Sequence, residues 1–414
     1  MSLMSSCANN SSDDDGLSNV VANPALICGC PQNKLWTQSV TPSCVFTNKC
    51  WTTTALGKGK KVLLAMSGGV DSSVSAAILQ QQGYEVVGAF MSRIGASQQP
   101  VAGGSDQACG SARDADDAKR LAELMGIELH VLNLGEQFAE IIDYFVGEYA
   151  AGRTPNPCAM CNMKLKFGLL IDLANSLGCD SLATGHYART GLYQGSPAVL
   201  RGLSRQKDQS YILFGIAKKN LGRIILPMGE MEDKAAVRKL ARSLGLGVHD
   251  KPDSQDICFI DGGDYTTLLA QRAPQALTPG RIIDAAGREL GRHTGYGRYT
   301  IGQRRGLGVA TGAPAYVTKI DPATGDVTLG TRAEASSQHL RAERANWHHK
   351  PGKDSFQAIV QIRYNHRGSA ATVQLSDDGG AFEVDFHEPI HAITPGQAAV
   401  VYDGQTLLGG GWIA

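Results

Sequence analysis

Hydrophobic and polar positions follow two alternating patterns from about residue 58 onward. Short apolar runs, KVLLAM, YEVVGAFM and IELHVLNL, predict buried strands. A helical period predicts helices over residues 72–82 and within ARDADDAKRLAELM, EQFAEIIDYFVGEYAAG and CNMKLKFGLLIDLANSLG. Gly83 and Gly126 follow the first two of these helices, where glycine commonly ends a helix. The alternation predicts an α/β fold, a doubly wound parallel sheet with helices on both faces.

After about residue 262 the pattern changes to short strands and glycine turns. From about residue 313 the period is that of strands, in AYVTKID, DVTLG, FQAIVQIRY, AATVQLSD, FEVDFHEPI and QAAVVYDG. These segments predict an antiparallel β-domain, a small barrel. We therefore expect a disordered extension over residues 1–57, an α/β catalytic domain over 58–262, a small central domain over 263–312 and a C-terminal antiparallel β-barrel over 313–414.

Composition narrows the classes of function. Among 414 residues, Lys and Arg number 39 and Asp and Glu number 39, which argues against binding nucleic acid by bulk charge alone. No apolar run approaches the roughly 20 residues that span a bilayer, and the acidic start does not resemble a secretory signal. We therefore expect a cytoplasmic protein with reduced cysteines. The cysteines to which we assign no role are Cys7, Cys28, Cys30, Cys44, Cys50, Cys109 and Cys179.

The segment SGGVDSS, residues 67–73, joins the first strand to the first helix. Backbone N–H groups and the positive helix end favour an anion here, and two glycines let the backbone approach it closely. The Gly-Lys-Ser/Thr ending of a Walker loop is absent from this segment. Ser67 and Thr184 both follow strands, at the sheet edge where ligands of such folds bind. The alternative interpretation is an ordinary glycine turn before a helix.

Three cysteines of the body lie in informative surroundings. Cys158 and Cys161 have CxxC spacing just before a predicted helix, whose N-terminus favours the thiolate of Cys161. Cys258 follows much later, in the acidic segment KPDSQDICFIDGGD. Cysteines in such surroundings serve thiol chemistry or metal binding.

Residues 281–306 form a basic stretch. Six arginines stand against two acids, Asp284 and Glu289, which gives a local charge of +4, and Tyr296 and Tyr299 lie among them. Such a stretch suits contact with nucleic-acid phosphates, although solvated surface loops can have the same composition.

Two resemblances to known families join these motifs. Ser-Gly-Gly-x-Asp-Ser resembles the PP-loop of the N-type ATP pyrophosphatases, which cleave ATP between the α- and β-phosphates and adenylate a substrate oxygen. Seven segments then occur in order: AMSGGVDSS, GRTPNP…CN…KF, ATGHYAR, KDQSYIL, DSQDICFI, TIGQRRGLG and TPGQAAVVYDG. Together they resemble the tRNA-uridine 2-sulfurtransferase family (MnmA/TrmU), over about residues 58–414.

The resemblance implies ATP-dependent thiolation of carbon 2 of the wobble uridine, position 34 of tRNA. ATP with Mg²⁺ adenylates the uracil oxygen, a persulfide delivers sulfur, and AMP and pyrophosphate are released. Cys161 would be the nucleophile and Cys258 the persulfide carrier, and the two could close a disulfide. The implied partners are the tRNAs for Lys, Glu and Gln and a cysteine desulfurase or sulfur-relay protein, with no membrane.

The resemblance also implies two sets of binding residues. The PP-loop residues, with Ser73 and with Asp71 near Mg²⁺, would cradle the phosphates, and two further residues would meet the nucleotide. The nucleotide-binding residues are Ala65, Met66, Ser67, Gly68, Gly69, Val70, Asp71, Ser72, Met91 and Gly185. The tRNA-contacting residues are Asn156, Pro157, Cys158, His186, Lys207, Asp208, Gln209, Arg363, Tyr364 and Gln397.

One departure from the family pattern leaves alternatives open. Many members have Asp at the position of Cys158, and that carboxylate is a candidate acid or base. Cys158, Cys161 and Cys258 could instead hold a 4Fe–4S cluster with one open iron, or a zinc ion, which usually takes four ligands.

Two other functions are considered. A PP-loop ligase that adenylates a small molecule would explain the loop but neither the three cysteines nor the basic stretch. A non-enzymatic tRNA-binding protein with an iron–sulfur or zinc site would leave the intact phosphate loop without a role.

Overall fold

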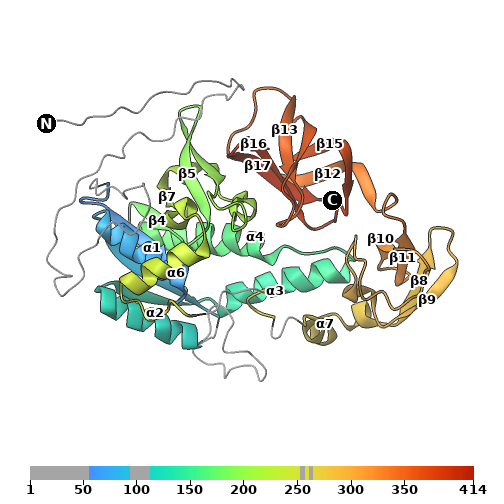
Figure 1. Ribbon diagram of the computed structural model, residues 1–414, viewed down its shortest axis with the longest axis horizontal. Helices are drawn as coiled ribbons and strands as arrows, with labels where there is room; N and C mark the ends of the chain where they lie inside the picture. Colours follow the sequence, from blue (N-terminus) through green and yellow to red (C-terminus); the bar gives the residue numbers. More distant parts are fainter. Residues whose placement is uncertain (1–55, 94–111, 252–256, 261–263) are drawn as a thin grey trace, which may run out of the picture.

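The computed structural model describes residues 56–93, 112–251, 257–260 and 264–414 (Figure 1). Nearly all of the predicted extension, with its five cysteines, lies outside the described residues, as does Cys109. The described chain forms an α/β domain, a central domain around a small sheet, and a C-terminal barrel. None of the described helices has the length and apolar character needed to cross a membrane.

A five-stranded, fully parallel sheet forms the α/β domain. Its strands, in spatial order, are β3 (Glu128–Asn133), β2 (Glu85–Ser92), β1 (Lys61–Ala65), β4 (Ser181–Ala183) and β7 (Ile224–Ile225). Side chains of β1 alternate between two cores, with Val62 and Leu64 in one and Leu63 in the other. The sheet is therefore buried on both faces, and the predicted α/β fold is confirmed.

Helices cover both faces of this sheet. The face toward Val62 is covered by α1 (Val70–Gln81), α2 (Ala112–Met125) and α6 (Lys234–Ser243). The face toward Leu63 is covered by α3 (Gly135–Ala150) and by a continuous helical segment made of α4 (Pro157–Cys161), a π-helix (Asn162–Leu169) and α5 (Leu170–Ser176). Gly83 and Gly126 have φ of +86° and +63°, as the predicted helix ends require.

The strand order creates a switch point between β1 and β4. From β1 the chain moves outward through β2 and β3, and it then returns to the opposite side of β1 to form β4. Loops that leave the carboxyl ends of β1 and β4 therefore diverge to opposite faces and leave a crevice, which is where open α/β sheets bind ligands.

The central domain is built on a four-stranded sheet. Its spatial order is β10 (Tyr316–Asp321), β11 (Asp326–Gly330), β8 (Gly280–Asp284) and β9 (Glu289–His293), preceded by α7 (Thr266–Arg272). Because β11 pairs with β8, the division expected at 312/313 would cut this sheet, and the pairing favours a boundary after Gly330. The long helix α3 reaches this domain, where Tyr149 stacks on Tyr265 at 4.5 Å (Figure 1).

The C-terminal barrel has six antiparallel strands. In spatial order they are β12 (Ser336–Trp347), β15 (Ala381–His391), β14 (Ser369–Leu375), β13 (Ser355–Gln361), β16 (Ala398–Asp403) and β17 (Thr406–Ile413). Pairing of β12 with β17 closes the barrel. A hairpin of the α/β domain, β5 (Ala188–Tyr193) and β6 (Ser196–Arg201), joins its edge where Leu200 pairs with Thr406.

Two glycine substitutions test the packing. A Cβ at buried Gly229 would collide with the Ala188 carbonyl oxygen, whereas a Cβ at exposed Gly147, inside α3, has no heavy atom within 4 Å. We expect Gly229→Ala to destabilise the fold by about 1–3 kcal/mol through overpacking. Gly147→Ala should stabilise it by about 0.5–1 kcal/mol because alanine loses less backbone entropy in a helix. Thermal unfolding of both variants measures this, and a lower midpoint for Gly147→Ala would contradict the described α3.

Candidate active site

The loop after β1 presents an open helix end at the switch point. Gly69 is the N-cap of α1 and has no side chain, so among the described residues the first N–H groups of α1 receive no side-chain cap from this position. Gly68 has φ of +69°, and a Cβ there would lie 2.5 Å from the carbonyl oxygen of Asp114. Only glycine therefore fits this turn, which leaves backbone donors facing the crevice, as an anion site requires.

The serines of this loop divide into two roles. Ser72 Oγ accepts a bond from the Ser67 N–H at 3.2 Å and donates to the Gly69 carbonyl at 3.0 Å. Ser73 Oγ donates to the same carbonyl at 2.8 Å, and both side chains are buried. Ser67 is exposed. The buried hydroxyls thus hold the turn, while Ser67 and the backbone are the groups that a ligand can reach.

Other residues expected to meet the nucleotide contribute in different ways. The side chains of Met66 and Val70 are buried in the core, so only their backbone atoms are available to a ligand. Gly185, after β4, packs on the start of α1, and a Cβ there would lie 3.2 Å from both Asp71 Cβ and the Ser72 nitrogen. The absence of a side chain therefore lets the two loops of the crevice touch.

The Asp71 carboxylate is held from two sides. Tyr187 donates its hydroxyl to Oδ1 at 2.7 Å, and Lys234, from the start of α6, donates to Oδ2 at 2.6 Å. Neither partner was predicted from the sequence. Tyr187 lies within the ATGHYAR motif and could have been found there, whereas nothing in the local pattern around Lys234 indicates its role.

His186 is buried between two polar partners. Its Nδ1 lies 2.6 Å from Thr184 Oγ1, and its Nε2 lies 3.4 Å from Lys166 Nζ. Lysine can only donate, so Nε2 accepts and Nδ1 donates its proton to Thr184. Burial and the charge of Lys166 lower the pKa of His186 well below 6.5, which keeps the ring neutral. This side chain, expected to face tRNA, thus holds the loop after β4.

The helix that carries Cys158 and Cys161, α4, is called the cysteine helix below, and it begins earlier than the sequence predicted. The Asn156 side chain accepts the Ala159 N–H at 3.1 Å, and Pro157 occupies the first position, so α4 starts before Cys158. Cys158 is exposed in the first turn, whereas Cys161 lies one turn further in and is half-buried. The helix N-terminus therefore favours a thiolate at Cys158 more than at Cys161, which corrects that part of the expectation.

Cys161 and Cys258 are close to the same core. Both pack against the core between the sheet and α3, and so do Ala65 and Met91 at the ends of β1 and β2. A π-helix, a feature often found at functional sites, begins directly after Cys161. Within the described residues, no three His, Cys, Asp or Glu side chains form a group that could hold a metal ion.

Two barrel segments reach this region. Gln397 donates to the carbonyls of Thr154 and Pro155 at 3.2 and 2.8 Å, so it fixes the loop before α4. Arg363 donates to the carbonyls of His391 and Ala392, and burial lowers its pKa.

The neighbouring Tyr364 is 41% exposed, which is unusual for so large a side chain in this protein. Burial, followed by the charges of Asp208 and Cys158, raises the pKa of Tyr364. Since Cys158 acts on its titration, this ring of the barrel lies close to the cysteine helix of the α/β domain.

In the Lys-Asp-Gln segment, residues 207–209, most of the polar groups form hydrogen bonds within the protein. Asp208 accepts bonds from Arg201, Gly202 and Ser210. Gln209 exchanges bonds with the backbone of Tyr187 at 2.8 and 2.9 Å. Asp208 and Gln209 therefore shape this loop, and Lys207 is its half-exposed cation.

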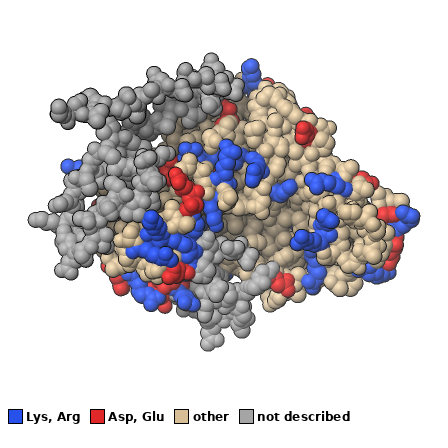
Figure 2. Space-filling model, in the orientation of Figure 1, with Lys and Arg blue, Asp and Glu red and all other residues tan. Residues whose placement is uncertain are grey.

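The basic stretch of the central domain is partly neutralised. Arg281, Arg288 and Arg292 form ion pairs with Asp326, Asp284 and Glu289, respectively. Arg304 and Arg305 are exposed and form no ion pair with the described residues. Figure 2 shows basic side chains over the middle of this face, between the α/β domain and the barrel, and toward the central domain.

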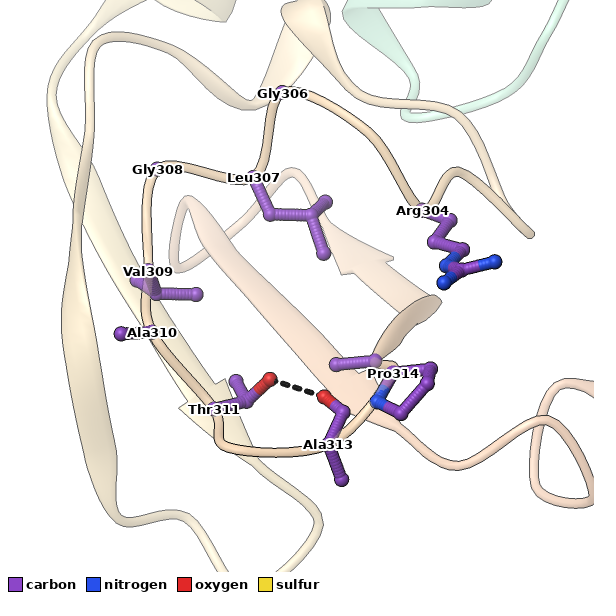
Figure 3. Close-up of a pocket in the computed structure, with 10 residues that line it drawn as sticks. Arg304, Gly306, Leu307, Gly308, Val309, Ala310, Thr311, Ala313 and Pro314 are labelled. Atoms are coloured by element: carbon purple, nitrogen blue, oxygen red, sulfur yellow. Dashed lines mark hydrogen bonds between the residues drawn. The ribbon is translucent and has the colours of Figure 1, made fainter.

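Arg304 also lines an open pocket of about 420 Å³ (Figure 3). The other residues that line this pocket belong to the glycine-rich loop, residues 306–315. In Figure 3, Leu307 points into the bend of this loop, and Thr311 bonds to the carbonyl of Ala313. The central domain lies at the opposite end of the molecule from β1 and β4, so this pocket is distinct from the crevice (Figure 1).

The fold and the crevice define an ATP-using PP-loop protein with two appended β-domains. Family models match all three parts: a tRNA methyl transferase HUP domain over residues 60–262, a tRNA methyl transferase PRC-barrel domain over 266–331 and an aminomethyltransferase β-barrel domain over 337–413. The chain is 47% identical over 361 residues to tRNA-specific 2-thiouridylase MnmA of Carboxydothermus hydrogenoformans, covering 86% of this chain and 97% of that protein. It is 44% identical over 357 residues to the same-named protein of Magnetococcus marinus, covering 86% and 99%. The chain belongs to the tRNA-specific 2-thiouridylase (MnmA) family, which confirms the predicted resemblance.

The neutral, buried His186 predicts a pH effect on stability. Its pKa is lower in the folded chain than the ordinary 6.5, so protons bind the unfolded chain preferentially as pH falls below that value. Its stabilising contribution is complete above pH 6.5 and decreases below it, by about 1 kcal/mol between pH 6.5 and 5.5. Denaturant unfolding at pH 6.5 and pH 5.5 measures the free energy of unfolding. Its loss between the two pH values should be smaller for His186→Gln than for the unaltered chain. An equal loss would mean that His186 is protonated in the folded state.

Proposed function

We propose that this chain thiolates carbon 2 of the wobble uridine, position 34 of tRNA, in an ATP-dependent reaction. The main support is that the open end of α1 lies at the switch point while Cys161 and Cys258 border the core that underlies it. A ligase for a small molecule is not favoured, because it would leave the cysteines and the family's two β-domains without a role.

The loops at the switch point are the proposed nucleotide site. The N–H groups of Gly68, Gly69 and the first turn of α1 would bind the phosphates, with Ser67 adding its hydroxyl. Asp71 is the proposed carboxylate facing the Mg²⁺ that accompanies ATP. Met91 and Gly185 border the adenosine in this proposal, since both lie where strands or their loops reach the crevice.

The proposed chemistry has two stages. The uracil O2 attacks the α-phosphorus of ATP, pyrophosphate leaves, and carbon 2 becomes activated because AMP is a good leaving group. The terminal sulfur of a Cys258 persulfide then attacks carbon 2, and AMP leaves with the oxygen. The Cys161 thiolate attacks Sγ of Cys258, the S–S bond to the transferred sulfur breaks, and that sulfur keeps the electron pair as 2-thiouridine.

The second stage leaves a disulfide between Cys161 and Cys258, which a thiol reductant must reduce. A cysteine desulfurase or a sulfur-relay protein must then restore the persulfide. A 4Fe–4S cluster on Cys158, Cys161 and Cys258 is not favoured, since the described residues bring no three such ligands together. We therefore derive no step through a cluster.

The proposed tRNA surface runs from the crevice across the barrel to the central domain. Tyr364 is an exposed ring near Cys158 and suits stacking on an unpaired base, while Lys207 suits a phosphate. His186, Asp208, Gln209, Arg363 and Gln397 would act by shaping the loops that carry such contacts. The tRNAs for Lys, Glu and Gln are the proposed substrates, and a cytoplasmic location stays a prediction.

Cysteine variants test the sulfur step. Nucleoside mass spectrometry would measure 2-thiouridine on unmodified tRNA supplied with Mg·ATP, a cysteine desulfurase, cysteine and a thiol reductant. We expect Cys161→Ser and Cys258→Ser to lose at least about a thousandfold in rate, as for other essential nucleophiles. Cys158→Ser and Cys158→Asp should retain thiolation, because the relay needs only two thiols. Loss of product in both Cys158 variants, in anaerobically prepared protein, would contradict the relay and favour the cluster.

Paired arginine variants test the central domain. The double variant Arg304→Ala, Arg305→Ala should weaken tRNA binding and reduce the slope of log affinity against log salt by about one to two, because two phosphate contacts are lost. The control, Arg288→Ala with Arg292→Ala, removes two exposed arginines that already have acidic partners. Filter binding at several salt concentrations distinguishes them. Equal slopes for the two double variants would show that the glycine-rich loop does not contact tRNA.

A further inference from the structure

A lysine from a distant segment brings its charge to the proposed phosphate loop, residues 67–73. Lys234, the first residue of α6, donates from Nζ to the Asp71 carboxylate at 2.6 Å. Asp71 lies in the first turn of α1, where the N–H groups proposed to bind the phosphates are also found. The Lys234 ammonium group is therefore at the same end of α1 as the proposed phosphate donors.

The phosphate loop itself carries no cation. Its sequence, SGGVDSS, contains neither Lys nor Arg, and Asp71 adds a negative charge. In a Walker loop, by contrast, a lysine within the loop reaches the β- and γ-phosphates. Backbone dipoles at a helix end supply only a partial positive charge. A full positive side-chain charge must therefore come from another segment, and Lys234 brings one to the first turn of α1.

The position of Lys234 is fixed by its helix. The preceding Asp233 caps α6 by accepting the Ala236 N–H at 2.7 Å. Further along α6, Val237 and Ala241 are fully buried in the core that α6 shares with α1 (Figure 1). The backbone at the start of α6 is thus held beside the loop, and the flexible stem of Lys234 can adjust the place of its charge.

Stability alone does not account for this ion pair. The side chains of Lys234 and Asp71 are only 16% and 29% exposed, so both charges lose much of their water. A pair of this kind gains little net free energy. Tyr187, which is buried, donates to the other carboxylate oxygen at 2.7 Å. Asp71 therefore keeps a hydrogen-bond partner when the Lys234 ammonium group turns toward a second acceptor.

We propose that Lys234 is a catalytic residue that binds the terminal phosphates of ATP and stabilises pyrophosphate as it leaves. In this step uracil O2 forms a bond to the α-phosphorus, and the bond from that phosphorus to the bridging oxygen breaks. The electron pair of the broken bond stays on pyrophosphate, where the ammonium group offsets the added charge. The uracil N3 proton is released to the solvent. This inference rests on the proposed function.

The test separates a phosphate contact from mere compensation of the Asp71 charge. It compares Asp71→Asn with the double variant Asp71→Asn, Lys234→Met in the full chain, so that neither protein has an unpaired carboxylate at residue 71. Isothermal titration with pyrophosphate and with AMP measures binding of the two parts of ATP separately. EDTA is present, so no Mg²⁺ takes part. Lys239→Met is the matched control, because Lys239 is an exposed lysine of the same helix.

Adding Lys234→Met to Asp71→Asn should weaken pyrophosphate binding about tenfold, because a charge-assisted hydrogen bond is lost, and should leave AMP binding unchanged. Lys234→Arg in the same background should stay within about threefold of Asp71→Asn, since it keeps the charge. Lys239→Met should match the unaltered chain. Equal pyrophosphate affinity in the single and double variants would overturn the inference. An equal loss for pyrophosphate and AMP would also overturn it, since it would indicate a distorted crevice.

A rate measurement tests the catalytic part. In pyrophosphate release from Mg·ATP with unmodified tRNA, Lys234→Met should lower kcat about a hundredfold, as loss of a group that stabilises developing charge does. A raised KM with unchanged kcat would overturn the catalytic role. If the unaltered chain releases pyrophosphate but forms no 2-thiouridine, the proposed function fails while the titrations still decide the role of Lys234. If the Met variants do not fold, Lys234→Gln in the Asp71→Asn background replaces them, with the same expected loss of pyrophosphate binding.

Discussion

The position of Cys158 and Cys161 depends on how the loop before α4 is held. Thr154 donates its N–H to Pro395 of the barrel at 2.9 Å, and Gln397 of the barrel donates back to the carbonyls of Thr154 and Pro155. At the start of the same loop, Arg153 forms a two-bond ion pair with Glu148 of α3, at 2.6 and 2.8 Å. The backbone groups that precede a helix are hard to satisfy in a buried loop. Here the barrel satisfies several of them, so the C-terminal domain contributes directly to the position of the cysteine helix.

The crevice, which we propose binds the phosphates of ATP, is rich in polar side chains and still remains open. A capping side chain would occupy the N–H groups of α1, yet Ser72 and Ser73 bond to the Gly69 carbonyl and leave those groups available. Asp71, the acid in the first turn, is paired with Lys234. Its negative charge is therefore compensated before any phosphate approaches, and an incoming anion meets backbone dipoles rather than an unpaired carboxylate.

The sequence predicted the features that depend on local chemistry. Strand and helix alternation, the glycine helix ends and the strand–loop–helix geometry of residues 67–73 are all encoded within short windows, and the structure confirms them. The sequence did not predict β12 or β17. In β17 the reason is that TLLGGGWI lacks the alternating pattern of a strand. Those glycines are explained only by tertiary contact: a Cβ at Gly409 would lie 2.5 Å from the Asn346 carbonyl across the barrel seam. The predicted start of α4 was too late because its cap, Asn156, stands between two prolines that indicate a loop, and the onset of the helix there depends on one side-chain bond.

Arg201 explains why the Lys-Asp-Gln loop and the barrel form one surface. It lies at the end of β6, donates to Asp208 at 3.1 Å and to Gln361 of the barrel at 2.9 Å, and lies 3.6 Å above the Tyr402 ring. An ion pair this buried gains little net free energy because both charges lose water. Its geometric effect is larger, since one planar cation sets the distance between two domains. A substrate that contacts both domains then meets a surface that is already ordered, and less of its binding energy is lost in arranging the protein.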